Sequence, residues 1–331
     1  MGSVEFVIWT GKGRAYTVSI ALPGSIVANA QSPELKTYLA GQVARAVTVF
    51  EIDEVVIFNE DLKQDAGEPT KKKGKEITGQ FEGATIKTDP NLFLARVLQY
   101  LETPQYLRKA FFPVHRDLTY AGLLNPLDAP HHMRKDAVAH YREGVTLARP
   151  VKKGQGSLVD CGMWQQVKID RHIQPGVRVT VKMQDPHGAK PGKHPKGTVV
   201  KPSAPREEAG LYWGYTTRIA NTMADIWSEC PYKEGYDLTV GTSENGENIH
   251  ELELPQANHI LIVFGGLAGL ESALDVDHSL GSAEAPDLFD YYVNTCPNQG
   301  SRTIRTEEAI LVTMSALRSK INNKHTGLNT S

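Results

Sequence analysis

The sequence predicts an α/β protein: an open, mostly parallel sheet into which a small all-β barrel is inserted. Apolar strand-like segments alternate with amphipathic helical segments at both ends of the chain, which is typical of a parallel sheet covered by helices. Between residues 143 and 205 apolar residues instead alternate with polar ones, as in short strands with one buried face. The chain has 331 residues, enough for two modest domains or for one domain with an insertion.

The amino-terminal part predicts a strand followed by a helix. Residues 15–23 are rich in β-branched and aromatic side chains and end at a Pro-Gly pair. Ser32 is expected to cap the helix, because a serine followed by proline at the first helical position, here Pro33, favours a helix start. The apolar face of that helix is expected to hold Leu35, Leu39, Val43 and Val47.

Three further segments complete this part of the chain. Residues 53–59 form a short apolar run bounded by turn residues, which suits a buried strand. Residues 61–80 include a lysine-rich stretch and are expected to form a mobile loop. Residues 91–104 predict another helix, which ends before Pro104.

The inserted module is expected to be a small barrel of the OB kind. One strand places Val177, Val179, Val181 and Met183 on one side and Arg178, Thr180 and Lys182 on the other. Tight turns between short strands are expected at Gly154, Gly156, Gly162 and Gly176. His187 and His194 fall in an expected hairpin loop; without a third ligand nearby, loop histidines are favoured over a metal site.

The carboxyl-terminal part returns to the α/β pattern. A helix is expected around residues 219–227. Three strands then follow, in residues 236–246, 259–271 and 290–303, and each ends in a loop rich in Gly, Thr, Ser or Asn. Thr306 is expected to cap the last helix. Because ligands of open α/β sheets bind outside the carboxyl ends of the strands, the loops GTSENG, FGGLAG and NTCPNQGS should converge on one site.

The residues of these loops favour a small-molecule pocket. FGGLAG has neither the G-x-G-x-x-G pattern nor a Walker lysine, so a dinucleotide or nucleoside triphosphate is disfavoured. Gly265 and Gly266 would allow a flat ring or a ribose to approach closely, or they simply form a tight turn. The backbone of residues 294–301 could bind the polar tail of a small molecule. Three such loops together favour a cofactor pocket.

Charge and cysteine content bear on the binding partners and on the cellular compartment of the protein. The net charge is -2, but residues 149–201 hold eleven Lys or Arg against three Asp or Glu. That segment is either a polyanion contact or a solvated lysine-rich surface. The three cysteines are far apart, which argues against a disulfide framework and a zinc cluster. The start of the chain shows no secretory signal pattern and no apolar run is long enough to span a bilayer, so we expect an intracellular protein.

Eight stretches, which cover nearly the whole chain, carry a family resemblance. They are YTVSIALPGSI (16–26), QSPELKTYLAGQVARA (31–46), YLRKAFFP (106–113), GLLNPLDAPHH (122–132), GLYWGYTTRIA (210–220), YDLTVGTSE (236–244), VFGGLAGLE (263–271) and NTCPNQGSRTIRTEEAI (294–310). With these motifs the chain resembles the SPOUT class of S-adenosylmethionine-dependent RNA methyltransferases, and more closely the archaeal and eukaryotic branch with an OB-like insertion. The last motif is the most specific of them.

The resemblance implies a fold that periodicity alone does not give. The carboxyl-terminal part of the sheet would form a trefoil knot, and the protein would be a homodimer or a heterodimer with each active site near the subunit interface. Residues 15–142 and 206–320 would form the knotted methyltransferase domain, and residues 143–205 the inserted barrel. Residues 1–14 and 321–331 would be flexible ends. A eukaryotic member of the class would be nuclear or nucleolar.

The resemblance also implies a pocket for the cofactor S-adenosyl-L-methionine, lined by ten residues of the three loops. They are Thr242, Glu244, Asn245, Gly265, Gly266, Asn294, Thr295, Gln299, Gly300 and Ser301. The methyl group would pass in line from sulfur to a base or ribose atom of RNA, with ribosomal RNA as the expected substrate. If the acceptor is N3 of a uridine, a nearby cation would stabilise the anion that forms.

Arg14, Arg302 and Arg305 are the candidates for that cation. Ion pairs with local acidic residues or contacts with the knot backbone are the alternative role for Arg302 and Arg305, which share one side only if the turn between them is helical. RNA would be held through phosphates by the barrel, with Lys190, Lys193 and Lys196 as candidates. Trp164 is either a stacking aromatic or a core residue. A different class of function also stays open: an assembly factor of ribosome biogenesis that keeps the fold without turnover.

Overall fold

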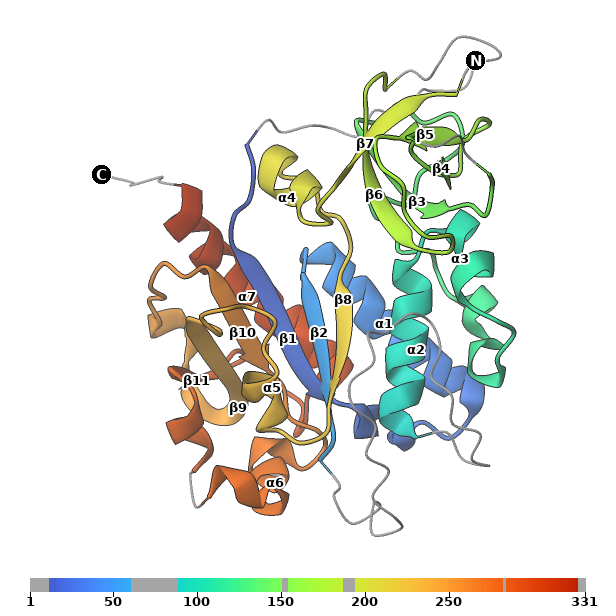
Figure 1. The fold of residues 1–331 in the computed structure, drawn as a ribbon. Coiled ribbons are helices and arrows are strands. Elements are labelled where there is room, and N and C mark those ends of the chain that lie inside the picture. Colours follow the sequence, from blue (N-terminus) through green and yellow to red (C-terminus); the bar gives the residue numbers. More distant parts are fainter. Residues whose placement is uncertain (1–11, 61–88, 151–153, 187–193, 282–283, 327–331) are drawn as a thin grey trace. The chain divides into compact units, whose positions relative to one another are not determined.

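The computed structural model describes residues 12–60, 89–150, 154–186, 194–281 and 284–326 (Figure 1). The chain divides into two compact units. One comprises the described residues within 1–15, 102–115 and 128–214, and the other those within 16–101, 116–127 and 215–331. The unit that holds the barrel therefore includes more of the chain than the inserted residues 143–205. The lysine-rich stretch of residues 61–80 lies outside the described residues.

The second unit is built on a parallel sheet of six strands in the order β11-β9-β10-β1-β2-β8 (Figure 1). Each neighbouring pair in the sheet runs parallel. The strands are β1 (Thr17–Pro23), β2 (Glu54–Phe58), β8 (Thr216–Ala220), β9 (Leu238–Asn248), β10 (His259–Val263) and β11 (Tyr291–Asn294). All carboxyl ends therefore meet at one edge, which is where a ligand site is expected.

Helices cover both faces of the sheet. On one face, Val18, Ile20 and Leu22 of β1 pack in one apolar cluster with α1 (Pro33–Val49), α2 (Pro90–Glu102) and α7 (Thr306–Thr326). On the other face, Ala21 of β1 packs in a second cluster with α5 (Asp225–Ser228) and α6 (Gly269–Val276). The alternation of β1 side chains between two cores is what a strand buried on both faces requires. The α/β class expected from the sequence is confirmed.

Helix α1 begins as its sequence predicts. The Ser32 hydroxyl accepts a hydrogen bond from the Leu35 N–H at 3.3 Å, and Pro33 is the first helical residue. Such a cap stabilises a helix by about 1 kcal/mol. The expected apolar face is correct for Leu39, Val43 and Val47, which are buried, and wrong for Leu35, which is 52% exposed.

The first unit contains a closed barrel of five strands in the order β3-β4-β5-β7-β6. The strands are β3 (Tyr141–Thr146), β4 (Leu158–Asp160), β5 (Val167–Ile169), β6 (Arg178–Met183) and β7 (Lys196–Val200). Val179, Val181 and Met183 face the barrel core, as predicted, whereas Val177 precedes the strand and is 41% exposed. Thr180, expected on the polar side, is buried because its hydroxyl bonds Glu143. Helices α3 (Gln105–Phe111) and α4 (Ala204–Ala209) belong to the same unit.

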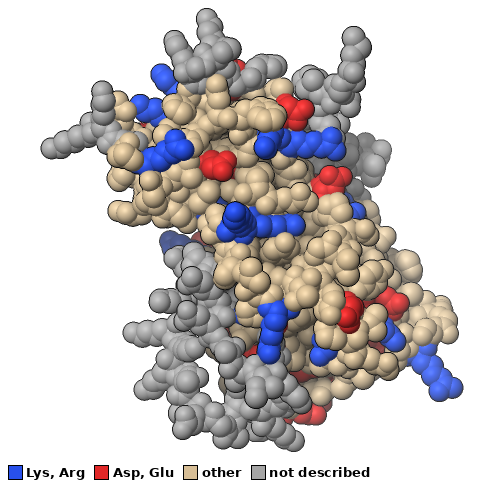
Figure 2. Space-filling view, turned by 90° about the vertical axis from the view of Figure 1, so that its right-hand side faces the viewer, with Lys and Arg blue, Asp and Glu red and all other residues tan. Residues whose placement is uncertain are grey.

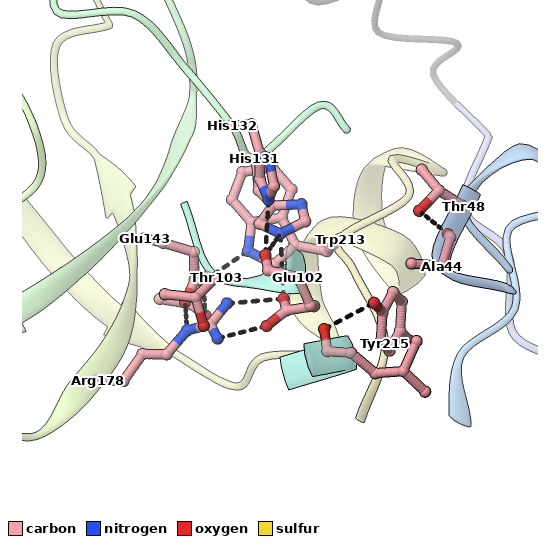
Figure 3. A network of polar contacts seen from close by, with 12 residues as sticks. Ala44, Thr48, Glu102, Thr103, His131, His132, Glu143, Arg178, Trp213 and Tyr215 are labelled. Atoms are coloured by element: carbon pink, nitrogen blue, oxygen red, sulfur yellow. Dashed lines mark hydrogen bonds and ion pairs between the residues drawn. The ribbon is translucent and has the colours of Figure 1, made fainter. Parts of the chain in front are cut away.

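A buried polar network fixes the interior of this unit (Figure 3). Arg178 donates two hydrogen bonds to the carboxylate of Glu102, at 2.7 and 2.9 Å, and a third to Glu143 Oε2 at 2.7 Å. Trp213 Nε1 donates to Glu143 Oε1 at 2.6 Å. Burial would raise the pKa of Glu102, but the charge and hydrogen bonds of Arg178 outweigh it and hold that pKa well below its usual range.

One element prediction of the carboxyl-terminal part is wrong. The expected helix at residues 219–227 is instead the end of strand β8 followed by the single turn of α5. The Arg218 guanidinium holds this corner, because it donates to the carbonyl oxygens of Asp225 and Ile226 at 3.0 and 2.9 Å. Among the described residues, no helix is long and apolar enough to cross a membrane.

Candidate active site

Hydrogen bonds link the three predicted loop segments at the carboxyl edge of the sheet. The Thr242 hydroxyl donates to the Val263 carbonyl oxygen at 3.0 Å, which joins the first segment to the second. The Asn294 side-chain amide donates to the Glu244 carbonyl oxygen at 2.8 Å, which joins the third to the first. The structure therefore brings the three segments together, as the sequence predicts.

The first segment is not the loop that was expected. Strand β9 continues to Asn248, so Thr242, Glu244 and Asn245 lie within the strand. β9 pairs with β10 only as far as Gly241, and its register with β11 shifts between Tyr292 and Val293. The predicted residues thus form an irregular bulge in the strand, a feature that often re-aims side chains beside functional sites.

Gly265 and Gly266 follow β10, and other protein atoms occupy the positions that side chains on these two residues would need. A Cβ on Gly265 would lie 2.6 Å from the Gly269 carbonyl carbon and 2.7 Å from the Leu270 nitrogen. A Cβ on Gly266 would lie 2.6 and 2.7 Å from the carboxylate oxygens of Glu60. A residue larger than glycine at 265 would clash with the start of α6. One at 266 would clash with the Glu60 carboxylate.

The third segment is held by its own polar groups. Asn294 Oδ1 accepts from the Cys296 N–H at 3.0 Å, and Gln299 Nε2 donates to the Ser301 carbonyl oxygen at 3.0 Å. The Thr295 hydroxyl lies 2.9 Å from that of Thr313 on α7. A Cβ on Gly300 would have no atom of the described residues within 4 Å. Of the predicted glycines, only Gly300 would direct a side chain into free space.

The helix that follows this segment does not begin as expected. Thr306 is the first residue of α7 rather than its cap, and its hydroxyl donates to the Gly265 carbonyl oxygen at 2.9 Å. Arg305 occupies the position before the helix, and its N–H donates to the Glu308 carboxylate at 3.0 Å, as in half of a capping box. The helix start is thereby tied to the glycine segment after β10.

Arg302 and Arg305 are both exposed, and neither side chain has a hydrogen bond or ion pair within the part of the chain that the structure describes. The turn between them is not helical, so the condition for their sharing one side is not met. The local ion pairs considered as their alternative role are absent from the described residues. Both guanidinium groups are free to contact an RNA ligand.

Arg14 is placed differently from the other candidates. It lies three residues before β1, at the amino end of that strand, whereas the glycine segment follows the carboxyl end of the parallel neighbour β10. Its N–H donates to the Arg206 carbonyl oxygen at 2.9 Å, and its own carbonyl oxygen accepts from Arg206 Nη1 at 2.7 Å. Arg14 belongs to the first unit, whereas the edge that holds Gly265 belongs to the second.

The candidate RNA contacts of the barrel are only partly described. Lys190 and Lys193 lie outside the described residues, and Lys196 is the exposed first residue of β7. Trp164 is 79% exposed, with the Lys135 ammonium 4.8 Å from its ring centroid, so it is not a core residue. On the face that Figure 2 shows, Lys and Arg side chains occur in several separate groups, with Asp and Glu side chains among them.

Four further polar side chains at the carboxyl edge were not predicted. Ser25 and Glu60 each lie two residues beyond the end of a strand, β1 and β2, and the Ser25 hydroxyl donates to the Glu60 carboxylate. The Tyr292 hydroxyl donates to Glu271 Oε1 at 2.8 Å, and burial raises the pKa of Tyr292 to about 12, so this phenol stays a donor. Polar residues directly after the first two strands were a sequence signal for Ser25 and Glu60.

Comparison with known proteins identifies the family of the chain. Residues 17–317 match the family described as "Putative RNA methyltransferase". The chain is 55% identical to the 28S rRNA (uridine-N(3))-methyltransferase of Mus musculus over 309 residues, 93% of this chain and 78% of the relative. The enzyme of the same name from Homo sapiens is also 55% identical, over 93% of this chain and 79% of the relative.

A solved structure is similar at a lower level. The SpoU methyltransferase AviRb of Streptomyces viridochromogenes, in complex with AdoMet, matches 97% of this chain and 63% of its own with 9% identity and a TM-score of 0.35. Because that score is below 0.5, the assignment rests on the sequence matches. The chain belongs to this family of RNA methyltransferases. Within it, the chain is a methyltransferase, as are the relatives to which it is 55% identical.

Proposed function

We propose that this protein transfers the methyl group of S-adenosyl-L-methionine to N3 of a uridine in the RNA of the large ribosomal subunit. The observation that carries the proposal is the 55% identity to two enzymes named for that reaction, over 93% of the chain. The convergence of three loop segments at one edge of the sheet supports it, because this is where a cofactor binds in such a sheet.

The residues present at this edge fit the cofactor. S-adenosyl-L-methionine carries positive charge on its sulfur and its amino group, and the carboxylates of Glu60 and Glu271 lie beside the glycine segment. The open space beside Gly300 leaves room for a flat ring against the loop backbone. When bound, the cofactor supplies a methyl group that is already electrophilic.

The protein's own groups have two tasks in this proposal. Backbone groups of residues 294–301 and of the glycine segment hold the cofactor, while the unpaired Arg302 and Arg305 stabilise negative charge on the uracil ring. A preorganised cation that faces developing charge is worth about 10²–10³ in rate when it is removed. Arg14 joins this role only if a partner subunit brings its amino-terminal segment to the site, as a dimer of the class would allow.

In the same proposal, the barrel binds the RNA. Its strands close in the order first, second, third, fifth, fourth, which is why we assign it to the OB kind, a fold that binds oligonucleotides on its second and third strands. Lys168 lies on the third strand, and exposed Trp164 lies between the second and third. An exposed aromatic beside lysines suits a single strand, whose bases stack while its phosphates meet the cations.

A charge-reversal variant tests this grip. Replacing Lys190, Lys193 and Lys196 together by Glu should weaken RNA binding and flatten its dependence on salt, because fewer counterions are released. Affinity for the cofactor should not change, which serves as the internal control. Equal RNA affinity and an equal salt slope in the variant would show that these lysines form only a solvated surface.

Methyl transfer to ribosomal RNA tests the function itself. Purified protein is incubated with labelled S-adenosyl-L-methionine and large-subunit RNA, and the methylated nucleotide and atom are mapped. A 3-methyluridine at one position is expected. Cofactor binding by calorimetry without any transfer would instead favour the assembly-factor hypothesis. Sedimentation of the protein alone and with its cellular partners would test the dimer, and imaging the expectation of a nuclear or nucleolar site.

A further inference from the structure

Three adjacent strands place polar or glycine residues at equivalent positions beyond their ends. Ser25 lies two residues after Pro23 of β1, Glu60 two residues after Phe58 of β2, and Gly265 two residues after Val263 of β10. β1 lies between β2 and β10 and is parallel to both. Residues at these positions therefore share the carboxyl edge of the sheet. In the register, Ser25 is level with Glu60, whereas Val263 pairs with Ala21, so Gly265 is level with Pro23.

The contacts show that Glu60 is held against the glycine segment. The Ser25 hydroxyl donates to Glu60 Oε1. Both oxygens of that carboxylate lie within 2.7 Å of the position that a Cβ on Gly266 would take. The carboxylate of Glu60 thus occupies space that any residue larger than glycine at 266 would need. The Ser25 hydroxyl is one of the groups that orient it.

Methylation at N3 of uridine requires a proton acceptor, and the arginines cannot act as one. This nitrogen carries a proton, and its lone pair becomes a good nucleophile only as that proton leaves. Arg302 and Arg305 can stabilise the resulting anion, but an arginine stays protonated in proteins and cannot accept the proton. A carboxylate beside the site can. Glu60 is the carboxylate that lies with both oxygens within 2.7 Å of the Cβ position of Gly266. Glu271 lies further along the segment and accepts from Tyr292, and exposed Glu244 is linked to Asn294 through its backbone.

We propose that Glu60 is the proton acceptor for N3–H of the target uridine, and this inference rests on the proposed function. The N3–H bond breaks and its proton passes to the Glu60 carboxylate. The N3 electron pair forms the bond to the methyl carbon, and the sulfonium sulfur keeps the electron pair of the broken S–C bond. Glu60 later releases the proton to water. Ser25 is a positioning residue, because it holds the carboxylate without touching the base.

The test is the Glu60→Gln variant, which keeps the shape of the side chain and removes its basicity. Single-turnover methyl transfer at neutral pH should fall by about a hundredfold or more, the range for losing a general base. The pH profile should also change. The wild-type rate reaches a plateau once Glu60 is ionised, whereas the variant rate should keep rising about tenfold per pH unit, because only ionised uridine then reacts. A 5-fluorouridine target, whose N3–H is more acidic, should restore part of the variant's rate.

Binding measurements separate this role from a purely structural one. The affinity of the Gln variant for S-adenosyl-L-methionine, measured by calorimetry, should stay close to the wild-type value. Ser25→Ala should slow transfer by several-fold, while Ser25→Thr, which keeps the hydroxyl, should recover most of the rate. Glu251→Gln is the matched control, because Glu251 is an exposed acid on the short helix after β9, next to Leu252, which contacts the far end of α7. That control should leave transfer unchanged.

Two results would overturn the inference. One is a Gln variant with full rate. The other is a variant that loses cofactor affinity while its pH profile stays parallel to that of the wild type, which would make Glu60 a cofactor contact. If thermal unfolding shows that the Gln variant does not fold, Glu60→Asp replaces it: a slower enzyme with the wild-type pH profile supports the inference, and full rate rejects it. Failure of the wild-type protein to methylate uridine N3 would instead reject the proposed function.

Discussion

Gly265 and Thr306 lie far apart in the sequence but hold the same segment of the site in place. Gly265 is adjacent to the backbone of Gly269 and Leu270, so Gly265→Val would displace the start of α6. Loss of cofactor binding in that variant would not distinguish a blocked pocket from a distorted loop. Thr306, whose hydroxyl bonds the Gly265 carbonyl oxygen, is a second contact that keeps this segment in place.

Arg305 is the residue whose substitution is most informative at this scale. Arg305→Lys keeps the positive charge but loses the forked donor geometry that suits a flat anionic ring. We expect the single-turnover rate to fall by at least about tenfold, which is less than the roughly 10²–10³ for removing a stabiliser because the charge is kept. Cofactor affinity should change little, because the exposed Arg305 side chain makes no hydrogen bond or ion pair with the predicted pocket within the part of the chain that the structure describes. The measurement is transfer of labelled methyl to the mapped RNA, with a parallel cofactor titration.

Arg302→Lys is the matched comparison for that prediction. Arg302 lies in the same exposed segment and, like Arg305, has no partner among the residues described. A lower rate in only one of the two variants would identify the arginine that faces the uracil ring. Full rate in both would remove the pair from the mechanism, and joint loss of thermal stability and cofactor binding would make them structural residues of the segment between β11 and α7.

At the scale of elements, the segment between β11 and α7 connects the site to the rest of the sheet. Its backbone includes Asn298 with a φ of 62°, in the left-handed region where asparagine is tolerated better than most residues. Its two ends are fixed by hydrogen bonds, through Asn294 to the β9 bulge and through Thr306 to the segment after β10. The part in between, around Gly300, is where a ligand can meet exposed backbone.

Gly300→Val tests whether this segment faces the cofactor. A Cβ at residue 300 meets no atom within 4 Å, so the fold should be kept, with a change in unfolding free energy within about 1 kcal/mol. The valine side chain should occupy the space expected for the cofactor and weaken its binding by at least about tenfold. Calorimetric titration with S-adenosyl-L-methionine is the measurement.

Gly122→Val is the control for Gly300→Val. Gly122 is exposed in a short 3-10 turn, and a Cβ there also meets no atom within 4 Å. It should leave both stability and cofactor affinity unchanged. If Gly300→Val binds the cofactor as tightly as this control, the open side of Gly300 does not face the pocket.

The elements themselves were predictable where one local signal dominates. Ser32 and Pro33 start α1 as expected, and the apolar run before Glu60 forms β2, since caps and buried strands are encoded locally. The corner after β8 was not predictable. The apolar residues around Ile219 suit a strand as well as a helix, and only the parallel pairing of this segment with β2 makes it a strand. The β9 bulge was missed for the same reason: its register depends on β11, 43 residues further along at the nearest.

At the scale of the whole molecule, the two compact units are stabilised in different ways. The sheet unit has two apolar cores, one on each face. The barrel unit has a smaller apolar core together with the buried network of Glu102, Arg178, Glu143 and Trp213. Sequence patterns indicated the apolar cores, but nothing in the order of residues indicated that side chains up to 111 positions apart would share one buried network. Breaking one partner of such a network leaves the other charge buried and uncompensated.

Two histidines extend this network, and His132 makes it sensitive to acid. His131 and His132 each place Nε2 on the Glu102 carbonyl oxygen, at 2.9 and 2.6 Å (Figure 3). Since a carbonyl oxygen only accepts, both Nε2 atoms are donors. Burial, with the neighbouring His131 adding to it, lowers the pKa of His132 to about 3, so this ring is neutral in the folded protein. In the unfolded chain the ring has the ordinary histidine pKa of about 6.5.

The difference predicts acid-induced loss of stability. The unfolded chain binds more protons than the folded one below pH 6.5, so the contribution of His132 is complete above that pH. It falls by about 1.4 kcal/mol per pH unit as the pH drops toward 3, the pKa in the folded state. The lowered pKa of Glu102 acts in the same direction, but only below its unfolded pKa of about 4.5. Between pH 6.5 and 4.5 the effect of His132 can therefore be measured separately from that of Glu102.

His132→Gln should flatten this window, because the amide keeps a donor for the Glu102 carbonyl oxygen and does not titrate. We expect the free energy of unfolding of the wild-type protein to fall by roughly 2 kcal/mol more than that of the variant between pH 6.5 and 4.5. Urea unfolding at several pH values measures it, and the exposed His172→Gln in the same unit is the control. Parallel pH dependences of His132→Gln and His172→Gln would show that His132 is not the group that charges on unfolding.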